Sequence, residues 1–260
     1  MSGDRTVVVH QDADVVAAAT AARLLTRLVD VQATGRVPAV VLTDGGIARS
    51  VHRAVRDAPA RGAVDWRRLD LWWGDERFVP AADPERNEGH ARADLLDAVP
   101  VDPARVHPMA ASDGPYGDDP DAAAEAYAEQ LARDASPEDH GEVPTFDVLM
   151  LGVGPDGHVA SLFPEHPACY DERAVVAVRN SPKPPPNRLS LTFGTLNHAR
   201  EVWFLVAGEE KARAVRMALS GAGELQVPAA GPRGLERTLW MLDAAAASQL
   251  PSDFARPASP

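Results

Sequence analysis

The chain has 260 residues, and its 26 Lys and Arg against 38 Asp and Glu give a formal net charge of −12 at pH 7. Hydrophobic residues make up 45% and charged residues 25% of the chain, which is the balance of an ordinary globular protein. Its length allows one large α/β domain or two small ones around a substantial core. The acidic balance argues against partners such as nucleic acid or an anionic membrane, which require a positive protein surface.

Predicted strands and helices alternate along the chain. Strands are expected at 7–10, 39–42, 69–73, 146–151, 174–178, 188–192, 202–206 and 239–242. Helices are expected at 12–31, 47–55, 88–96, 122–133, 209–219 and 244–250. This β-α-β-α order predicts an α/β fold with an open, mostly parallel twisted sheet and helices on both faces, as in Rossmann-like proteins.

Two segments rich in Asp, Gly and Pro, 110–120 and 134–144, are expected to be loops of an insertion and not domain linkers. We therefore expect a single domain over 1–250, followed by a flexible tail over 251–260. Cys169 is the only cysteine, which excludes an intrachain disulfide and favours a reducing compartment. With neither a signal peptide nor an apolar run that could span a membrane, the expected location is cytoplasmic.

The segments that follow the predicted strands hold the candidate site, because ligands of open α/β sheets bind beyond the carboxyl ends of the strands. One of them, 149–164, contains Gly152-x-Gly154-x-x-Gly157 directly after a strand, a pattern that occurs in dinucleotide-binding proteins. The prolines in and after this segment leave little room for the helix that such a site requires, and the next acidic residues precede a strand instead of ending it. We therefore interpret the segment as a glycine-rich turn that positions side chains.

His158 follows Asp156 by two residues in this turn. Imidazole takes and returns a proton near neutral pH, and a nearby carboxylate can fix its tautomer and orientation. An isolated histidine more often has a structural role, but the surrounding glycines and the position at a strand end favour function here. His158 is therefore a candidate catalytic residue, with Asp156 as its partner.

Arg77 ends a run of three charged residues, Asp75-Glu76-Arg77, directly after a predicted strand. A solvated turn is one interpretation, and the other is that the planar guanidinium grips a phosphate or a developing oxyanion. Asn87, further along the chain, is expected to cap the next helix; contact with a ligand is the alternative.

Only two of the 26 basic residues are lysines, and both lie in segments suited to an anion. Lys183 and Arg188 lie on a proline-rich run that leads into a strand, where a pre-ordered backbone lowers the entropic cost of binding. Lys211 lies in the first turn of a predicted helix, which is unfavourable for a cation unless it shares an anion with the helix N-terminus.

Four of these segments resemble the 6-phosphogluconolactonase family, whose fold is shared with the glucosamine-6-phosphate deaminases. The resemblance covers nearly the whole chain and rests on WGDER (73–77), GVGPDGHVASLFP (152–164), SPKPPPxR (181–188) and GxxKA (208–212). In the deaminases a similar Asp-Gly-His turn is followed by a Phe-Asn-Glu-Pro type of sequence. Here Ala-Ser-Leu-Phe-Pro follows, which favours the lactonases.

The resemblance implies hydrolysis of 6-phospho-D-glucono-1,5-lactone to 6-phosphogluconate, without a metal or an organic cofactor. It implies that His158 is the general base for attack by water and that Asp156 orients it. Arg77 and Lys211 would hold the phosphate or offset charge on the tetrahedral intermediate. Arg188 would help to bind the phosphate.

The loop Thr43-Asp44-Gly45-Gly46 precedes a predicted helix and has the form of a phosphate cradle, with Thr43, Gly45 and Gly46 as candidate binding residues. Asp44 works against this interpretation, because a carboxylate repels phosphate. The family usually carries a Ser/Thr-Gly-Gly loop at this place, so Asp44 also departs from its pattern. The departure predicts either weakened activity or another group that takes over.

Other chemistry has less support in the sequence. Ser161 lacks the Gly-x-Ser-x-Gly elbow of serine hydrolases, Cys169 has no cationic neighbour in sequence, and the scattered histidines form no metal-binding pair. An amino-sugar-phosphate isomerase or deaminase and a non-catalytic sugar-phosphate-binding protein are the alternatives. The expected partner is a small sugar phosphate, bound by a monomer or a small homo-oligomer.

An anionic substrate gains no attraction from a net charge of −12, so the attraction must be local. We expect Lys183, Lys211, Arg77 and Arg188 to form a compact positive pocket at the carboxyl ends of the strands. Both lysines should then lie near His158.

Overall fold

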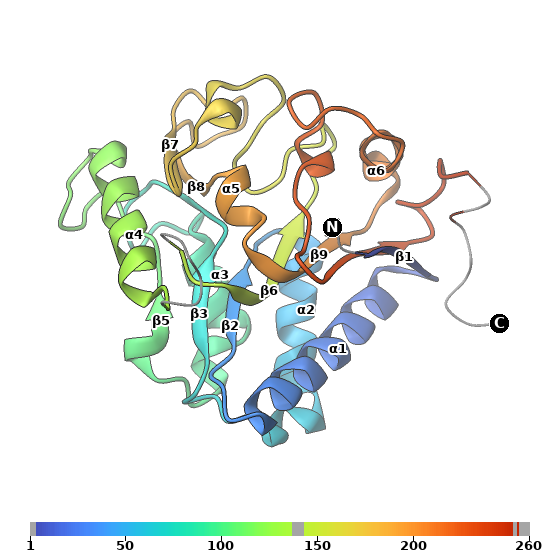
Figure 1. The fold of residues 1–260 in the computed structure, drawn as a ribbon, viewed down its shortest axis with the longest axis horizontal. Helices are drawn as coiled ribbons and strands as arrows, with labels where there is room; N and C mark the ends of the chain where they lie inside the picture. The colour runs from blue at the N-terminus through green and yellow to red at the C-terminus, as the bar shows by residue number, and fades with distance from the viewer. Residues whose placement is uncertain (1–3, 137–142, 252–253, 255–260) are drawn as a thin grey trace.

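A seven-stranded sheet forms the centre of the molecule (Figure 1). The computed structural model describes residues 4–136, 143–251 and 254. The strands lie in the order β1-β10-β9-β6-β2-β3-β5, and every neighbouring pair is parallel. Their bounds are Asp4–His10 (β1), Ala39–Leu42 (β2), Asp70–Trp73 (β3), Val106–His107 (β5), Phe146–Gly152 (β6), Ala199–Val206 (β9) and Arg237–Asp243 (β10). The predicted α/β fold with a mostly parallel sheet is confirmed.

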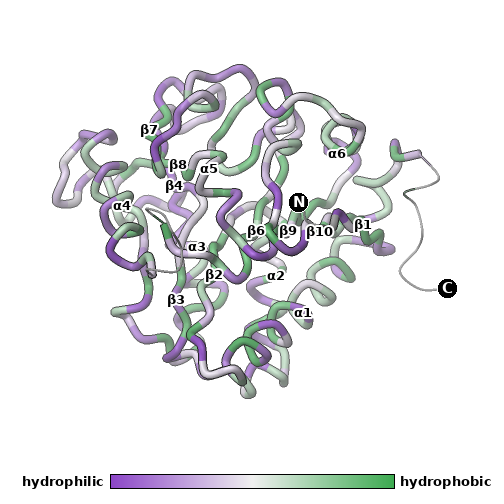
Figure 2. The backbone as a smooth tube through the Cα atoms, in the orientation of Figure 1, coloured by the Kyte–Doolittle hydropathy of each residue, from purple (hydrophilic) through white to green (hydrophobic). Residues whose placement is uncertain are grey.

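The central strands are short apolar runs, as strands covered on both faces should be. In β6, FDVLMLG, every residue before Gly152 is buried, and Figure 2 shows hydrophobic colours along this strand while many outer loops are hydrophilic. The chain runs from β2 outward to β3 and β5 and then returns to β6 on the other side of β2. The connections after β2 and β6 therefore diverge, and such a switch point leaves a crevice at the carboxyl ends of the strands.

Helices cover both faces of this sheet. One face carries α1 (Ala13–Ala33), α2 (Gly46–Asp57) and α3 (Asn87–Asp94), and the other carries α4 (Pro120–Asp134), α5 (Phe193–Leu196) and α6 (Ala212–Leu219). Successive side chains of a strand point to opposite faces, so Trp73 packs with the first group and Trp72 with the second. The Asp12 carboxylate caps α1 by accepting a hydrogen bond from the Val15 N–H at 2.9 Å.

A small antiparallel sheet lies on the face that carries α4, in the order β4-β8-β7. Its strands are Asp75–Arg77 (β4), Val175–Val178 (β7) and Arg188–Leu191 (β8). The sequence predicts the last two as strands, but not that they form a separate sheet, because alternation does not specify the pairing partner. It also misses β4, since three consecutive charged residues indicate a solvated turn unless their partners are known.

Several element boundaries differ from the prediction. Residues 244–250 form turns instead of a helix: the Asp243 carboxylate accepts hydrogen bonds from the N–H groups of Ala246 and Gly208, and Pro251 follows directly. The predicted helix over 209–219 begins with a 3₁₀ turn, Glu209–Lys211 (η6), before α6. Asn87 is the first residue of α3 and does not cap it with its side chain.

Parts of two predictions lie outside the described residues. These are the centre of the loop over 134–144 and most of the tail over 251–260. Among the helices of the described chain, none combines the length and the apolar character that a membrane crossing requires.

Candidate functional site

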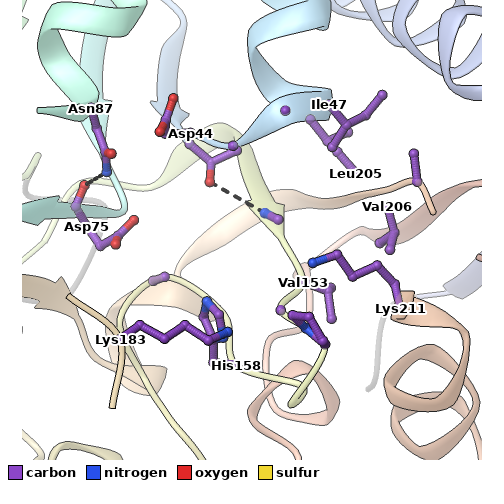
Figure 3. Close-up of a pocket in the computed structure, with 18 of the residues that line it drawn as sticks. Asp44, Ile47, Asp75, Asn87, Val153, His158, Lys183, Leu205, Val206 and Lys211 are labelled. Carbon is purple, nitrogen blue, oxygen red and sulfur yellow. Dashed lines mark hydrogen bonds between the residues drawn. The ribbon is translucent and has the colours of Figure 1, made fainter. Parts of the chain in front are cut away.

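A cavity of about 380 Å³ opens at the carboxyl ends of β2, β6 and β9, beside the small sheet (Figure 3). Eight of the nine predicted site residues line it: Thr43, Gly45, Gly46, Arg77, His158, Lys183, Arg188 and Lys211. The ninth, Asp156, does not line the cavity but contacts the ring of His158, which does. Residues that are up to 168 positions apart in the chain (43 to 211) therefore meet in one place.

The turn after β6 holds His158 toward the cavity. Gly154 N–H donates to the His158 carbonyl, and Gly157 N–H donates to the Gly154 carbonyl, both at 2.9 Å. Gly157 has a φ of +85°, a conformation that favours glycine. A side chain at Gly154 would overlap both the His158 ring and the Asp156 carboxylate. The glycines thus allow the histidine and the aspartate to lie against the same backbone turn.

His158 and Asp156 form a close pair, with 2.6 Å between His158 Nδ1 and Asp156 Oδ1. Lys183 Nζ lies 3.2 Å from each of these two atoms. Burial disfavours the ionised form of Asp156, but hydrogen bonds and charge from His158 and Lys183 outweigh it and hold the pKa of Asp156 well below its usual range. Asp156 is therefore an anion at neutral pH, and it occupies Nδ1 while leaving Nε2 of His158 for a ligand.

Arg188 is buried at the start of β8, and its hydrogen bonds differ from those expected of a phosphate ligand. Its donors reach the backbone carbonyls of Lys183, Pro184 and Pro185 at 2.9–3.2 Å and the Ser161 hydroxyl at 3.5 Å. Of the five N–H donors of a guanidinium, only one Nη1 hydrogen is left for a phosphate.

Arg77, the last residue of β4, reaches the cavity beside the loop after β2. Its Nη1 donates to the Glu85 carbonyl at 2.6 Å and lies 3.5 Å from Asp44 Oδ2. The other carboxylate oxygen of Asp44 lies 3.2 Å from His90 Nδ1. Asp44 is thus flanked by two basic side chains instead of facing a phosphate alone, which offsets the repulsion expected from the sequence.

Lys211 lies on the opposite side of the cavity from Asp44 (Figure 3), at the junction of η6 and α6. Burial lowers the pKa of Lys211, Glu210 at 3.9 Å opposes that shift, and Lys183 adds to it. A half-buried ammonium that also feels the charge of Lys183 is costly without an anion, which suits a site for a phosphorylated ligand.

The cavity is less positive than expected. Four cationic side chains line it, but so do three carboxylates: Asp44, Asp75 and Glu210. Asp75 accepts a hydrogen bond from the Ser161 hydroxyl at 2.7 Å, and Asp44 has the two basic partners described above. The pocket is therefore of mixed charge instead of compactly positive. The electrostatic potential that a ligand meets depends on which charged side chains are paired with one another.

The loop Thr43–Gly46 leads into α2, whose first residue is Gly46. Gly45 precedes it with a φ of +108°, and no side chain caps the helix. The free N–H groups of the first turn and the helix dipole face the cavity, where they favour an anion or a hydroxyl oxygen. Thr43 Oγ1 is 3.4 Å from the Gly152 N–H, which links this loop to the end of β6.

Three lining or supporting residues escape the sequence prediction. The sequence does not predict that Asp75 accepts a hydrogen bond from Ser161 or that His90 contacts Asp44. It also does not predict that Glu76 is fully buried beneath the site. The Glu76 carboxylate accepts hydrogen bonds from the N–H groups of Arg77 and Asn87 at 2.7–2.8 Å, so it caps α3 in place of Asn87. No sequence signal identifies this contact, because the partners come from separate elements.

The other nucleophiles fit poorly with covalent catalysis. Ser161 is buried and donates to Asp75, and burial raises the pKa of the Cys169 thiol to about 11. In the part of the chain that the structure describes, no three His, Cys, Asp or Glu side chains form a group that could hold a metal ion.

Comparison with known proteins shows which family the chain resembles. Residues 11–240 match the family model described as glucosamine-6-phosphate isomerases/6-phosphogluconolactonase. A 6-phosphogluconolactonase of Streptomyces coelicolor is 61% identical over 260 residues, which cover all of both chains. One of Mycobacterium tuberculosis is 47% identical over 247 residues, 95% of this chain and 98% of the relative. The solved structure of 6-phosphogluconolactonase from Trypanosoma brucei matches with a TM-score of 0.81 at 29% identity, covering 96% of this chain and all of that one.

Proposed function

The chain belongs to the family of glucosamine-6-phosphate isomerases and 6-phosphogluconolactonases, and we propose His158 as the general base of its reaction. That reaction is the hydrolysis of 6-phospho-D-glucono-1,5-lactone to 6-phosphogluconate in the oxidative pentose phosphate pathway. The relatives carry the name of this lactonase, which favours hydrolysis over the deaminase and the non-catalytic alternatives.

The pair formed by Asp156 and His158 carries the proposal. Asp156 holds Nδ1, so Nε2 accepts the proton of a water molecule whose oxygen attacks the lactone carbonyl carbon. The bond between that carbon and the ring oxygen then breaks, and the proton on Nε2 passes to the ring oxygen, which becomes a hydroxyl. The other product group is a carboxylic acid, which ionises at neutral pH.

The cations have a supporting role in this scheme. Arg77 and Lys211 hold the phosphate or offset the negative charge of the tetrahedral intermediate, while the loop formed by Thr43, Gly45 and Gly46 offers backbone N–H groups. Lys183, whose ammonium lies 3.2 Å from Asp156 Oδ1 and from His158 Nδ1, adds positive charge to the side of the cavity that holds this pair.

Three expectations about the whole protein are also proposals. The first is one domain over 1–250, which the pairing of β1 with β10 supports because it joins both ends of the chain in one sheet. The others are a cytoplasmic location and a monomer or small homo-oligomer.

Replacement of the base tests the proposal. The lactone also hydrolyses spontaneously, so the rate must be measured against a blank without enzyme, by oxidation of the 6-phosphogluconate formed. We expect His158→Ala to lower kcat by about 10²–10⁴-fold, the usual contribution of a positioned base. His166→Asn is the matched control, since His166 bonds the Arg179 carbonyl outside the cavity. Wild-type turnover in a folded His158→Ala variant would contradict the assignment.

A further inference from the structure

The hydrogen bonds of Arg188 concentrate on one short segment. Nη2 donates to the carbonyls of Lys183 at 3.1 Å and Pro184 at 2.9 Å, and Nε donates to that of Pro185 at 3.2 Å. The side chain is buried, with a residue exposure of 5%. Three donors in a rigid planar fork therefore fix three consecutive backbone carbonyls, which a flexible lysine could not do.

The segment that Arg188 fixes includes Lys183, whose ammonium lies 3.2 Å from both Asp156 Oδ1 and His158 Nδ1. The Lys183 side chain is itself more than one-third exposed, so packing alone does not hold it. Its position beside the histidine depends on where its backbone lies. The carbonyl of Lys183 is one of the acceptors of Arg188, so the arginine controls the ammonium indirectly.

A second contact leads from Arg188 to the same histidine. The guanidinium carbon lies 5.5 Å from the centre of the Phe163 ring, within the range of a cation–π contact. The Phe163 ring is buried, and its centre lies 4.6 Å from that of the His158 ring. Arg188 thus supports His158 from two sides, through Phe163 and through Lys183.

We propose that Arg188 is a positioning residue that holds Lys183 and Phe163 against His158, and that it is not the main phosphate ligand. The inference rests on the proposed role of His158. It differs from the role that the family resemblance implies for Arg188, because four of its five donors already have partners in the protein.

Two roles for Arg188 predict different kinetic results. A positioning role predicts a fall of about 10²-fold in kcat for Arg188→Ala, the cost of a small misplacement of reacting groups, with unchanged inhibition by inorganic phosphate. A phosphate-binding role predicts weaker inhibition by inorganic phosphate and little change in kcat. Arg188→Lys, which keeps the charge but not the fork, should resemble the alanine variant in kcat.

Chemical rescue separates loss of the group from loss of the fold. Methylguanidinium added to Arg188→Ala should restore part of kcat if the cavity left by the side chain is intact, and it should not stimulate the wild type. Arg105→Lys is the matched control, because Arg105 is paired with Asp70 away from the cavity. Thermal unfolding shows whether each variant is folded. If Arg188→Ala is not folded, the kcat of Arg188→Lys tests the proposal instead.

The outcomes also distinguish this inference from the function on which it rests. A near-wild-type kcat in the Arg188 variants, with His158→Ala inactive, refutes the positioning role alone. An active His158→Ala variant refutes the proposed base, whatever the Arg188 variants do.

Discussion

The parallel sheet and the small antiparallel sheet contribute side chains of different kinds to the same cavity. The loops after β6 and β9 bring an imidazole, His158, and an amine, Lys211, whereas β4 and β8 bring the guanidinium groups of Arg77 and Arg188. The loop residues depend on side-chain partners such as Asp156 for their orientation. The backbone of the strand residues is fixed by the hydrogen bonds between β4 and β8, and their long arginine side chains extend from it into the cavity.

The small sheet also contains a conflict that the parallel sheet lacks. Arg77 and Arg188 are direct partners across the antiparallel pair β4–β8, where like charges destabilise a sheet. Burial lowers the pKa of Arg188, Asp75 opposes that shift, and Arg77 adds to it. Carbonyl oxygens offset part of this repulsion: that of Glu85 accepts from Nη1 of Arg77, and those of Lys183, Pro184 and Pro185 accept from Arg188. Such a local cost is expected where function, and not stability, selects the residues.

The largest effect that distinguishes the two sheets is expected at Arg77. Arg77→Ala should lower kcat/KM for lactone hydrolysis by about 10²–10³-fold, the usual cost of removing a donor that stabilises developing negative charge. Its thermal unfolding temperature should not fall, since the substitution removes one of two facing like charges. Steady-state rates above the spontaneous reaction and a thermal melt measure the two quantities.

Arg77→Lys provides the control for charge alone. It should recover only part of the activity, because an ammonium lacks the planar fork. If Arg77→Ala lost stability and kept its activity, the division of roles between the sheets would be wrong, and Arg77 would be a structural residue.

The sequence predicts the parallel sheet better than the small antiparallel sheet. Six of the seven parallel strands contain apolar runs, and the glycine-rich turn after β6 marks where His158 must lie, so these could be predicted. The seventh, β5, has only two residues, Val106–His107, which is too short for a pattern, and the prediction misses it. The strand β4 could not be predicted either, because its charged residues become compatible with burial only through distant partners. Asp75 needs Ser161, and Glu76 needs the first N–H groups of α3.

Site prediction reached the identities of the lining residues but not their partners. The proline-rich run places Arg188 near the site but does not show which carbonyls its guanidinium meets. The loop after β2 likewise does not show that Asp44 has Arg77 and His90 as neighbours, because they lie 33 and 46 positions further along the chain. Motifs of charged residues show where in the sequence a site lies. Which of these residues form ion pairs or hydrogen bonds with one another can be read only from the folded structure.

Lys211, which follows β9 of the parallel sheet, should bind an anion less well as pH rises. Its pKa is lowered, mainly by burial, so the ammonium is lost at a lower pH than that of an ordinary lysine, and the affinity for an anion falls as pH rises. We therefore expect the Kd of 6-phosphogluconate, measured by calorimetry between about pH 7 and 10, to increase with pH. In Lys211→Arg the increase should shrink, because a guanidinium remains protonated. An identical rise in both proteins would assign the titration to another group.

Replacement of Asp44 should have the smallest effect on catalysis, and whether it changes kcat or KM distinguishes two roles of the carboxylate. If its ion pair with Arg77 orients the guanidinium, Asp44→Asn lowers kcat by up to about fivefold, which corresponds to about 1 kcal/mol for a modest ion pair. If the carboxylate instead repels the substrate, the same variant lowers KM and leaves kcat unchanged. We expect the first result, because both carboxylate oxygens already face basic side chains. In an Arg77→Ala background Asp44→Asn should then have no further effect, since a positioning residue has nothing to act on once its target is gone.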